Sequence, residues 1–169
     1  DLGMPFNRCP KAIKLDYRVK LTDSPNRIRQ TGFSKVSTVP GRDMPEMVVI
    51  LQQRKENTDG SITAKRVGTQ IYKFTQSTNG WVEGKAFDIM YGDITKHPGY
   101  TKRMDLMRGD ATIYARNSKG ENVPVDENGW ADASATPTHA IVKFDSSHGG
   151  AYIGSIGTTL WLDNIKWVY

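Results

Sequence analysis

Residues 144–169 read FDSSHGGAYIGSIGTTLWLDNIKWVY and decide the fold predicted for this chain. A strand end leads through a glycine- and serine-rich crossing into a long run of alternating apolar residues. The large apolar side chains of that run are Leu160, Leu162, Ile165, Trp167 and Tyr169. The first two share one parity and the last three share the other, although side chains along a strand alternate between two faces.

A one-residue bulge at Asp163-Asn164 would repair this fault in parity. Such a bulge inserts one extra residue into a strand and bends the ladder. With the bulge, all five large side chains face one core, and Trp161 points the other way. We therefore expect the final run to be the strand that closes a β-sandwich.

The rest of the chain also has the pattern of strands. Residues 11–21, KAIKLDYRVKL, alternate apolar and charged side chains, as in a half-buried antiparallel strand. Further strands are predicted at residues 47–52, 62–66, 69–75, 86–90, 111–115 and 140–144. Turns are predicted at residues 57–61, 79–80, 117–120 and 126–129, a long surface loop at 22–45, and a helical turn or strand flank at 101–108. Short strands at roughly ten-residue spacing indicate one all-β domain, an antiparallel β-sandwich over residues 1–169.

Composition narrows the function classes. The net charge of +5 is spread along the chain, whereas nucleic-acid-binding proteins usually concentrate cations and interleave them with aromatic residues, so no nucleic-acid partner is expected. No apolar run approaches the ~18 residues that indicate a membrane-spanning helix. The single cysteine, Cys9, excludes an internal disulfide and a cysteine-based zinc site.

Catalytic motifs are missing from the sequence. It contains no glycine-rich phosphate loop and no G-x-S-x-G, and His97, His139 and His148 lie far apart. Glycoside hydrolysis needs two facing carboxylates, and nothing marks one pair among the acids of the predicted loops. Those acids are Asp88, Asp93, Asp105, Asp110, Glu121, Asp126 and Glu127. We therefore assign no catalytic residue.

Aromatic residues are more informative, because indole and phenol rings offer a flat apolar face on which a sugar ring can stack. The candidate glycan-binding residues are Trp81, Tyr91, Tyr100, Trp130 and Trp161. The alternative for each is that it covers an end of the sandwich. Trp167 and Tyr169 are assigned to the core.

No cofactor is expected, with one exception. Oxygen ligands at Asp163 and Asn164 could complete a calcium site together with an early residue such as Asp1. The alternative is a bulge whose side chains hydrogen-bond to the backbone.

Two stretches at opposite ends of the chain resemble a known family. IVKFDSS followed by GSIGTTLWLDNIKW, at residues 141–147 and 154–167, resembles the end of the carbohydrate metabolism domain of exported proteins from gut-dwelling Gram-negative bacteria. GMPFNRCPKAIKLDYRV, at residues 3–19, resembles its early strand. The matching motifs are Pro5-Phe6, Ser146-Ser147 and Asp163-Asn164.

The resemblance implies a jelly-roll sandwich like the carbohydrate-binding modules. It also implies a cell-surface, outer-membrane or secreted location, and a role in polysaccharide capture. The chain is then expected to be the C-terminal domain of a longer exported protein. Related domains have a strand before the P-F loop, and only four residues precede Pro5 here. A missing partner strand would leave an exposed sheet edge.

The leading hypothesis is a non-catalytic glycan-binding module. The positive net charge could favour acidic glycans. One alternative is a structural or adhesion sandwich that docks another protein through an open edge. Another is a glycan-active hydrolase whose carboxylates the sequence does not identify.

Overall fold

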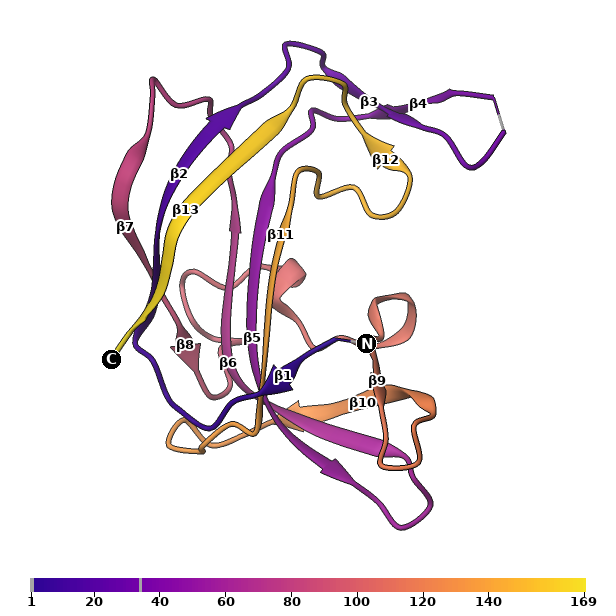
Figure 1. Cartoon of the computed structure of the whole chain (residues 1–169), viewed down its shortest axis with the longest axis vertical. Coiled ribbons are helices and arrows are strands. Elements are labelled where there is room, and N and C mark those ends of the chain that lie inside the picture. The colour runs from indigo at the N-terminus through magenta and orange to yellow at the C-terminus, as the bar shows by residue number, and fades with distance from the viewer. Residues whose placement is uncertain (1, 34) are drawn as a thin grey trace.

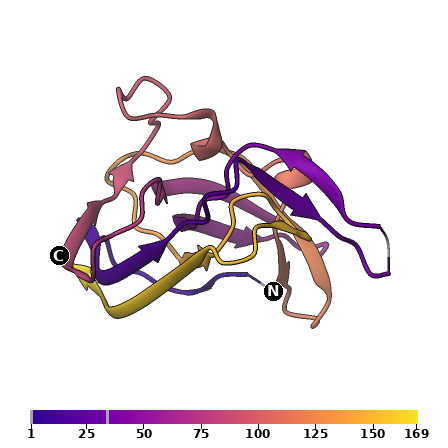
Figure 2. The same cartoon turned by 90° about the horizontal axis from the view of Figure 1, so that it is seen from above.

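The computed structural model describes residues 2–33 and 35–169 and is nearly all β, with sheets stacked in a sandwich-like arrangement (Figures 1 and 2). Its only helical elements in the described residues are two single 3-10 turns, η1 (Lys102–Met104) and η2 (Gly109–Ala111). No helix in this part of the chain is long and apolar enough to cross a bilayer. The all-β prediction is confirmed, and η1 supplies the helical turn expected at residues 101–108.

The largest sheet forms the centre of the molecule. Its strands, in spatial order, are β1 (Met4–Pro5), β11 (His139–Asp145), β5 (Glu46–Glu56), β6 (Ile62–Lys73), β10 (Asn122–Trp130) and β9 (Tyr114–Arg116), while β8 (Met90–Tyr91) pairs with β6 off this path. The pairing of β10 with β6 is parallel, and all other strand pairs described are antiparallel. The sheet is therefore mixed, where the sequence predicted antiparallel pairing throughout.

Two smaller sheets flank the large one. The first consists of β13 (Thr159–Val168), β2 (Ala12–Lys20) and β7 (Val82–Asp88), with β2 in the middle. The second consists of β12 (Ile153–Gly154), β3 (Asn26–Arg29) and β4 (Ser37–Pro40), and it extends to one side of the molecule (Figure 1).

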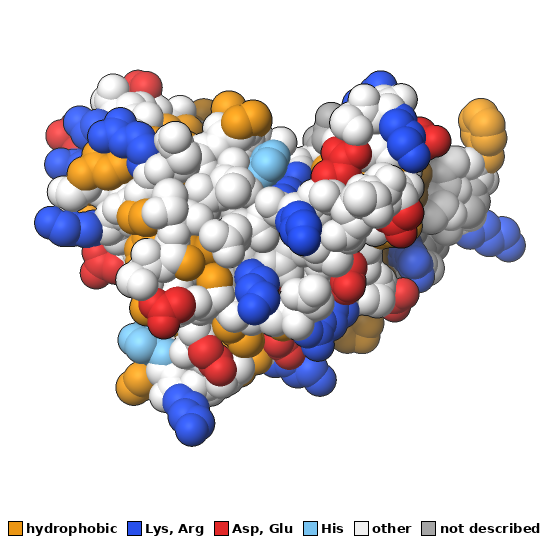
Figure 3. Space-filling view, turned by 90° about the horizontal axis from the view of Figure 1, so that it is seen from below, with side chains coloured by type: hydrophobic (Ala, Val, Ile, Leu, Met, Phe, Trp, Pro, Cys, Tyr) orange, Lys and Arg blue, Asp and Glu red, His pale blue; other side chains and the backbone are white. Residues whose placement is uncertain are grey.

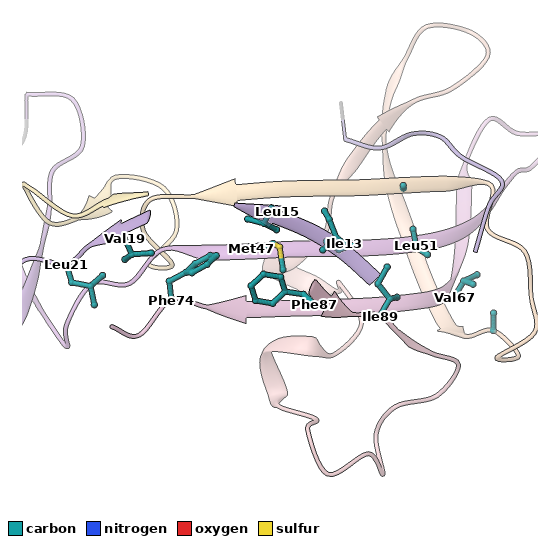
Figure 4. Packing of buried hydrophobic residues seen from close by; sticks show 13 residues of the cluster. Ile13, Leu15, Val19, Leu21, Met47, Leu51, Val67, Phe74, Phe87 and Ile89 are labelled. Carbon is teal, nitrogen blue, oxygen red and sulfur yellow. The ribbon is translucent and has the colours of Figure 1, made fainter. Parts of the chain in front are cut away.

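The β13-β2-β7 sheet covers what we call the first face of the large sheet. Alternate residues of β2 from Ile13 onward, together with Leu21 just after it, meet Met47, Val49 and Leu51 of β5 in one apolar cluster (Figure 4). Phe87 of β7 and Phe74, next to the end of β6, fill the space between the layers. The strict alternation in residues 11–21 thus produces a buried inner face and a charged outer face.

The opposite, second face of the large sheet is covered without strands. The segment 92–113, which includes η1 and η2, lays Ile94, Met104 and Ile113 over Val48 and Ile50. An irregular segment therefore carries one half of the core.

The bulge predicted in the closing strand is present. Asp163 pairs with Asp16 and Lys166 with Lys14, so two residues of β13 oppose one residue of β2. Asn164 has φ of 51°, in the left-handed region that Asn tolerates better than most residues.

The prediction that all five large residues of this strand face one core is wrong for two of them. Leu160, Leu162 and Trp167 pack on the first-face cluster. Ile165 lies within the bulge, where the edge strand bends, and about half of it is exposed. Tyr169 follows the end of β13, and the guanidinium of Arg8 lies over its ring.

Three local predictions also need correction. Residues 22–45 contain the hairpin β3–β4, whose short polar strands lack the alternation that marks a buried face. The two strands expected between residues 62 and 75 are one long strand, β6, interrupted only by a register shift. Residues 126–129 belong to β10 rather than to a turn, and an irregularity between Glu127 and Gly129 accommodates the turn-like sequence.

Candidate functional site

The outer face of the β13-β2-β7 sheet brings two of the five candidate aromatic residues together. Trp161 pairs with Arg18 in the β13–β2 register, and the Arg18 guanidinium lies 5.0 Å from the centre of an indole ring. Trp81 directly precedes Val82, which pairs with Tyr17 on the other side of β2. Trp81 itself precedes β7, and extending this register by one residue places it opposite Arg18, so we infer that Trp81, Arg18 and Trp161 form a row across the outer face. The two indoles are 47% and 37% exposed.

Next to this row, two bulges lie on either side of one residue of β2 and leave a depression in the surface of the sheet. The β13 bulge at Asn164 lies on one side of Asp16, and a register shift in β7 at Gly84 lies on the other. The Asp16 carboxylate accepts a hydrogen bond from the Asn164 side-chain amide and one from the Gly84 backbone N–H. These bonds lower the pKa of Asp16, so the group is a carboxylate at neutral pH.

The resulting open depression has a volume of about 420 Å³. It is lined by Lys14, Asp16, Glu83, Gly84, Asn164 and Lys166. We call the Trp81–Arg18–Trp161 row and this depression together the outer-face site. It combines flat aromatic surfaces with amide, ammonium and carboxylate groups, which can hydrogen-bond the hydroxyls of a sugar.

The other three aromatic candidates lie elsewhere and are partly buried. Tyr91 donates a hydrogen bond from its hydroxyl to the Pro10 carbonyl, and burial raises the pKa of this phenol. Tyr100 and Trp130 pack against the second-face cluster, and the Arg66 guanidinium lies 5.5 Å from the Trp130 ring centre. These three residues do not join the row on the outer face.

Glu127, one of the seven acids considered for hydrolysis, is buried on the second face. It forms an ion pair with Arg66 at 2.6 Å, and neither side chain is exposed. Glu127 also accepts the Met107 backbone N–H, while Arg66 donates to the Met104 and Asp105 carbonyls. The pair therefore anchors the segment 104–107 to the sheet. None of the seven acids lines the outer-face site or the second-face pocket described next.

A pocket of about 490 Å³ lies on the second face at the end where β5 begins and β11 finishes. Its lining consists of Glu46, Arg103, Lys143, Asp145 and the segment 147–151, and we call it the polar pocket. Glu46 and Asp145 are opposite one another in the β5–β11 register. Each has a cationic partner, Arg103 at 2.7 Å and Lys143 at 2.7 Å.

Sequence reasoning missed the polar pocket and half of the outer-face site. Glu46 and Asp145 are 99 positions apart in the chain and meet only through strand pairing. Asp16 and Arg18 could have been selected, because the alternation of residues 11–21 already places their side chains opposite the core. The second bulge, at Gly84, gave no such signal, because Val82 is the one apolar residue of β7 before the bulge and does not establish a pattern.

The calcium prediction has no further support in this structure. An Asp163 carboxylate oxygen accepts the Asn164 backbone N–H, as the bulge alternative proposed. Asp1 lies outside the described residues. Within the described ranges, no group of three or more His, Cys, Asp or Glu side chains could hold a metal ion.

No family model, no curated protein and no solved structure matches the chain. The site must therefore be interpreted from its own chemistry. On the face shown in Figure 3, cationic and acidic side chains are interspersed and do not gather into a basic stripe. This distribution differs from the continuous basic stripe that a nucleic-acid interface would need.

Proposed function

We propose that this chain is a non-catalytic glycan-binding module with a jelly-roll-like sandwich, part of an exported bacterial protein at the cell surface or secreted. The observation that carries the proposal is the pair of exposed indoles, Trp81 and Trp161, on either side of Arg18. Sugar rings stack on the indoles, and Arg18 and Asp16 bind hydroxyls beside them.

The length of the site suits an oligosaccharide rather than a single sugar. Arg18 and Lys14 are four residues apart on β2, which corresponds to about 13 Å along an extended strand. The surface is shallow, so each contact buries little area, and association must still offset the loss of translational and rotational freedom. Affinity for one oligosaccharide is therefore weak, and attachment to a larger protein or a repeated polymer would raise it.

The proposal is tested by replacing the aromatic residues. Trp161→Ala and Trp81→Ala should each weaken polysaccharide binding by about tenfold, the effect of losing a buried aromatic anchor at an interface. Affinity gel electrophoresis against a panel of neutral and acidic polysaccharides identifies a ligand, and calorimetry then gives the affinities.

Tyr114→Ala is the matched control, because Tyr114 is a similarly exposed aromatic residue on β9 of the large sheet. It should leave affinity unchanged. Absence of binding to every polysaccharide, or an equal loss in Tyr114→Ala, would exclude the proposal.

Docking of another protein is the second candidate, because one sheet edge is incompletely paired. β1 pairs only with His139 and Ala140 of β11, and the register that is described leaves residues 141–145 without a β1 partner. Such an edge can accept an added strand. Self-association or partner capture that disappears when Val142, at this edge, becomes Pro would favour docking; a monomer at high concentration with no partner would count against it.

A further inference from the structure

The polar pocket is separate from the outer-face site. It lies on the second face of the large sheet, whereas the β13-β2-β7 sheet covers the first face. Its volume of about 490 Å³ is within the range of small-molecule sites in proteins. No Phe, Tyr or Trp lines it, so a ligand there would be held mainly by hydrogen bonds.

The charged groups of the pocket are already matched in pairs. The Arg103 guanidinium contacts both carboxylate oxygens of Glu46, through Nε at 3.1–3.2 Å and Nη2 at 2.7 Å. Lys143 contacts Asp145 at 2.7 Å. Two cations and two carboxylates leave the lining without net charge. Lys73 and Arg27 are close by but do not line the pocket.

These pairs differ from the sealed Arg66–Glu127 pair, because they remain open to the pocket. The exposed fractions of the Arg103, Lys143 and Asp145 side chains are 38%, 43% and 32%. The Lys143 ammonium has three N–H donors and contacts one oxygen of Asp145, and a carboxylate can accept several hydrogen bonds. Unused donors and acceptors therefore lie side by side in the pocket.

His148 adds an uncharged acceptor. Its Nδ1 lies 3.2 Å from the Met44 carbonyl oxygen, which can only accept, so Nδ1 carries the proton and Nε2 keeps a lone pair. Burial, and then the nearby Lys73, lower the pKa of His148, which keeps the ring neutral at pH 7. The backbone of this loop is fixed by Ser147, whose hydroxyl donates to the buried Asp43.

We propose that the polar pocket is a second carbohydrate site, one that takes a single uncharged, hydroxyl-rich sugar ring. An anionic ligand would have to compete with Glu46 or Asp145 for their cations, and a cationic ligand would have to compete with Arg103 or Lys143. A hydroxyl group needs neither exchange, because it accepts from Lys143 or Arg103 while it donates to Asp145 or His148. The pocket therefore suits a free monosaccharide or the terminal ring of a glycan.

The test is a titration of the full chain, labelled with nitrogen-15, with single sugars. Neutral glucose, galactose, mannose and N-acetylglucosamine are compared with the anion glucuronate and the cation glucosamine. At least one neutral sugar should shift the Gly149 and Gly150 amides saturably, with a dissociation constant of about 1 mM or weaker. The best neutral sugar should bind at least about threefold more tightly than either charged one.

Asp145→Asn and His148→Ala should each weaken that binding by about fivefold or more, since each removes one acceptor. Asp126→Asn is the matched control, because Asp126 is an exposed strand aspartate of β10 outside the pocket, and it should have no effect. Spectra of the free variants confirm that they fold, as expected for the loss of a half-exposed ion pair.

Three outcomes would overturn the inference: no shift at Gly149 or Gly150 with any sugar, tighter binding of glucuronate or glucosamine, or an equal loss in Asp126→Asn. The result is independent of the outer-face site. Sugars that shift only amides around Gly84 and Trp161 would exclude the pocket while supporting the proposed function, and polysaccharide binding abolished only by the tryptophan variants would do the same.

Discussion

The two faces of the large sheet are covered in different ways. A three-stranded sheet covers the first face through apolar contacts centred on Leu15, Met47 and Phe87. An irregular segment covers the second, and the buried pair Arg66–Glu127 fixes it in place. Strands that cover a face are specified locally by alternation, whereas a covering segment without periodic structure needs polar bonds to define its position.

The functional candidates follow the same division. The covering strands leave a regular outer face, on which alternation aligns Trp81, Arg18 and Trp161. At the border of the covering segment, the polar pocket lies where Arg103 of η1 meets Glu46 at the start of β5. A regular layer thus favours an extended binding surface, and an irregular layer favours a pocket at its border.

The largest expected effect comes from breaking the buried pair on the second face. Glu127→Gln leaves Arg66 charged and buried without a carboxylate, which should lower the free energy of unfolding by about 3–5 kcal/mol. Urea unfolding followed by tryptophan fluorescence measures this loss.

The matched variant is the double substitution Arg66→Met with Glu127→Leu. It removes both charges together and should recover most of the lost stability, because well-packed apolar residues often replace a buried ion pair without cost. If Glu127→Gln lowered the free energy of unfolding by less than about 1 kcal/mol, the segment 92–113 would be held by its apolar side chains instead. Both faces of the sheet would then be covered through apolar contacts.

The sequence predicted the regular layer and not the irregular one. Alternation identified β2, and the fault in parity located the β13 bulge at Asp163-Asn164, because both signals lie within one strand. Arg66 and Glu127 are 61 positions apart, and neither has a local signal that marks it as buried. The β3–β4 hairpin was missed for a related reason, since both of its strands are largely exposed and polar.

The same limit applied to function. Trp161 could be predicted as outward-facing because its parity opposes that of Leu160 and Leu162. The depression around Asp16 could not be predicted, because it requires two bulges on different strands at one height. Cross-strand pairs such as Glu46 and Asp145 depend on register, which the sequence of either strand alone does not give.

A smaller effect is expected from the bulge in the regular layer. Asn164→Val places a β-branched residue at φ of 51°, which should cost about 1–3 kcal/mol of stability, measured by thermal unfolding. Asn164→Gly relieves the backbone but removes the bond to Asp16, so its cost should be below about 1 kcal/mol. Equal costs for the two variants would mean that the side-chain bond, and not the backbone conformation, determines the bulge.

The smallest expected effect is the dependence of stability on pH below the ordinary histidine pKa of 6.5. Burial lowers the pKa of His148 and of His139, aided by Lys73 and Arg54 respectively, so the unfolded chain binds more protons than the folded chain once the pH falls below the ordinary histidine value of 6.5. Stability should therefore be fully present above that value, decrease as the pH falls through it, and stop decreasing below the lowered pKa values.

The four aspartates whose pKa values are lowered contribute at lower pH than the two histidines. The lowered pKa values of Asp16, Asp59, Asp93 and Asp132 mean that their contribution is lost only as the pH falls below about 3.8. Urea midpoints at constant ionic strength should therefore fall between pH 7 and 5 in the natural chain and stay flatter in the double variant His139→Gln with His148→Gln. A steep fall that persists in this variant would place the acid sensitivity elsewhere; a fall removed by His148→Gln alone would assign it to the border of the irregular layer, next to the polar pocket.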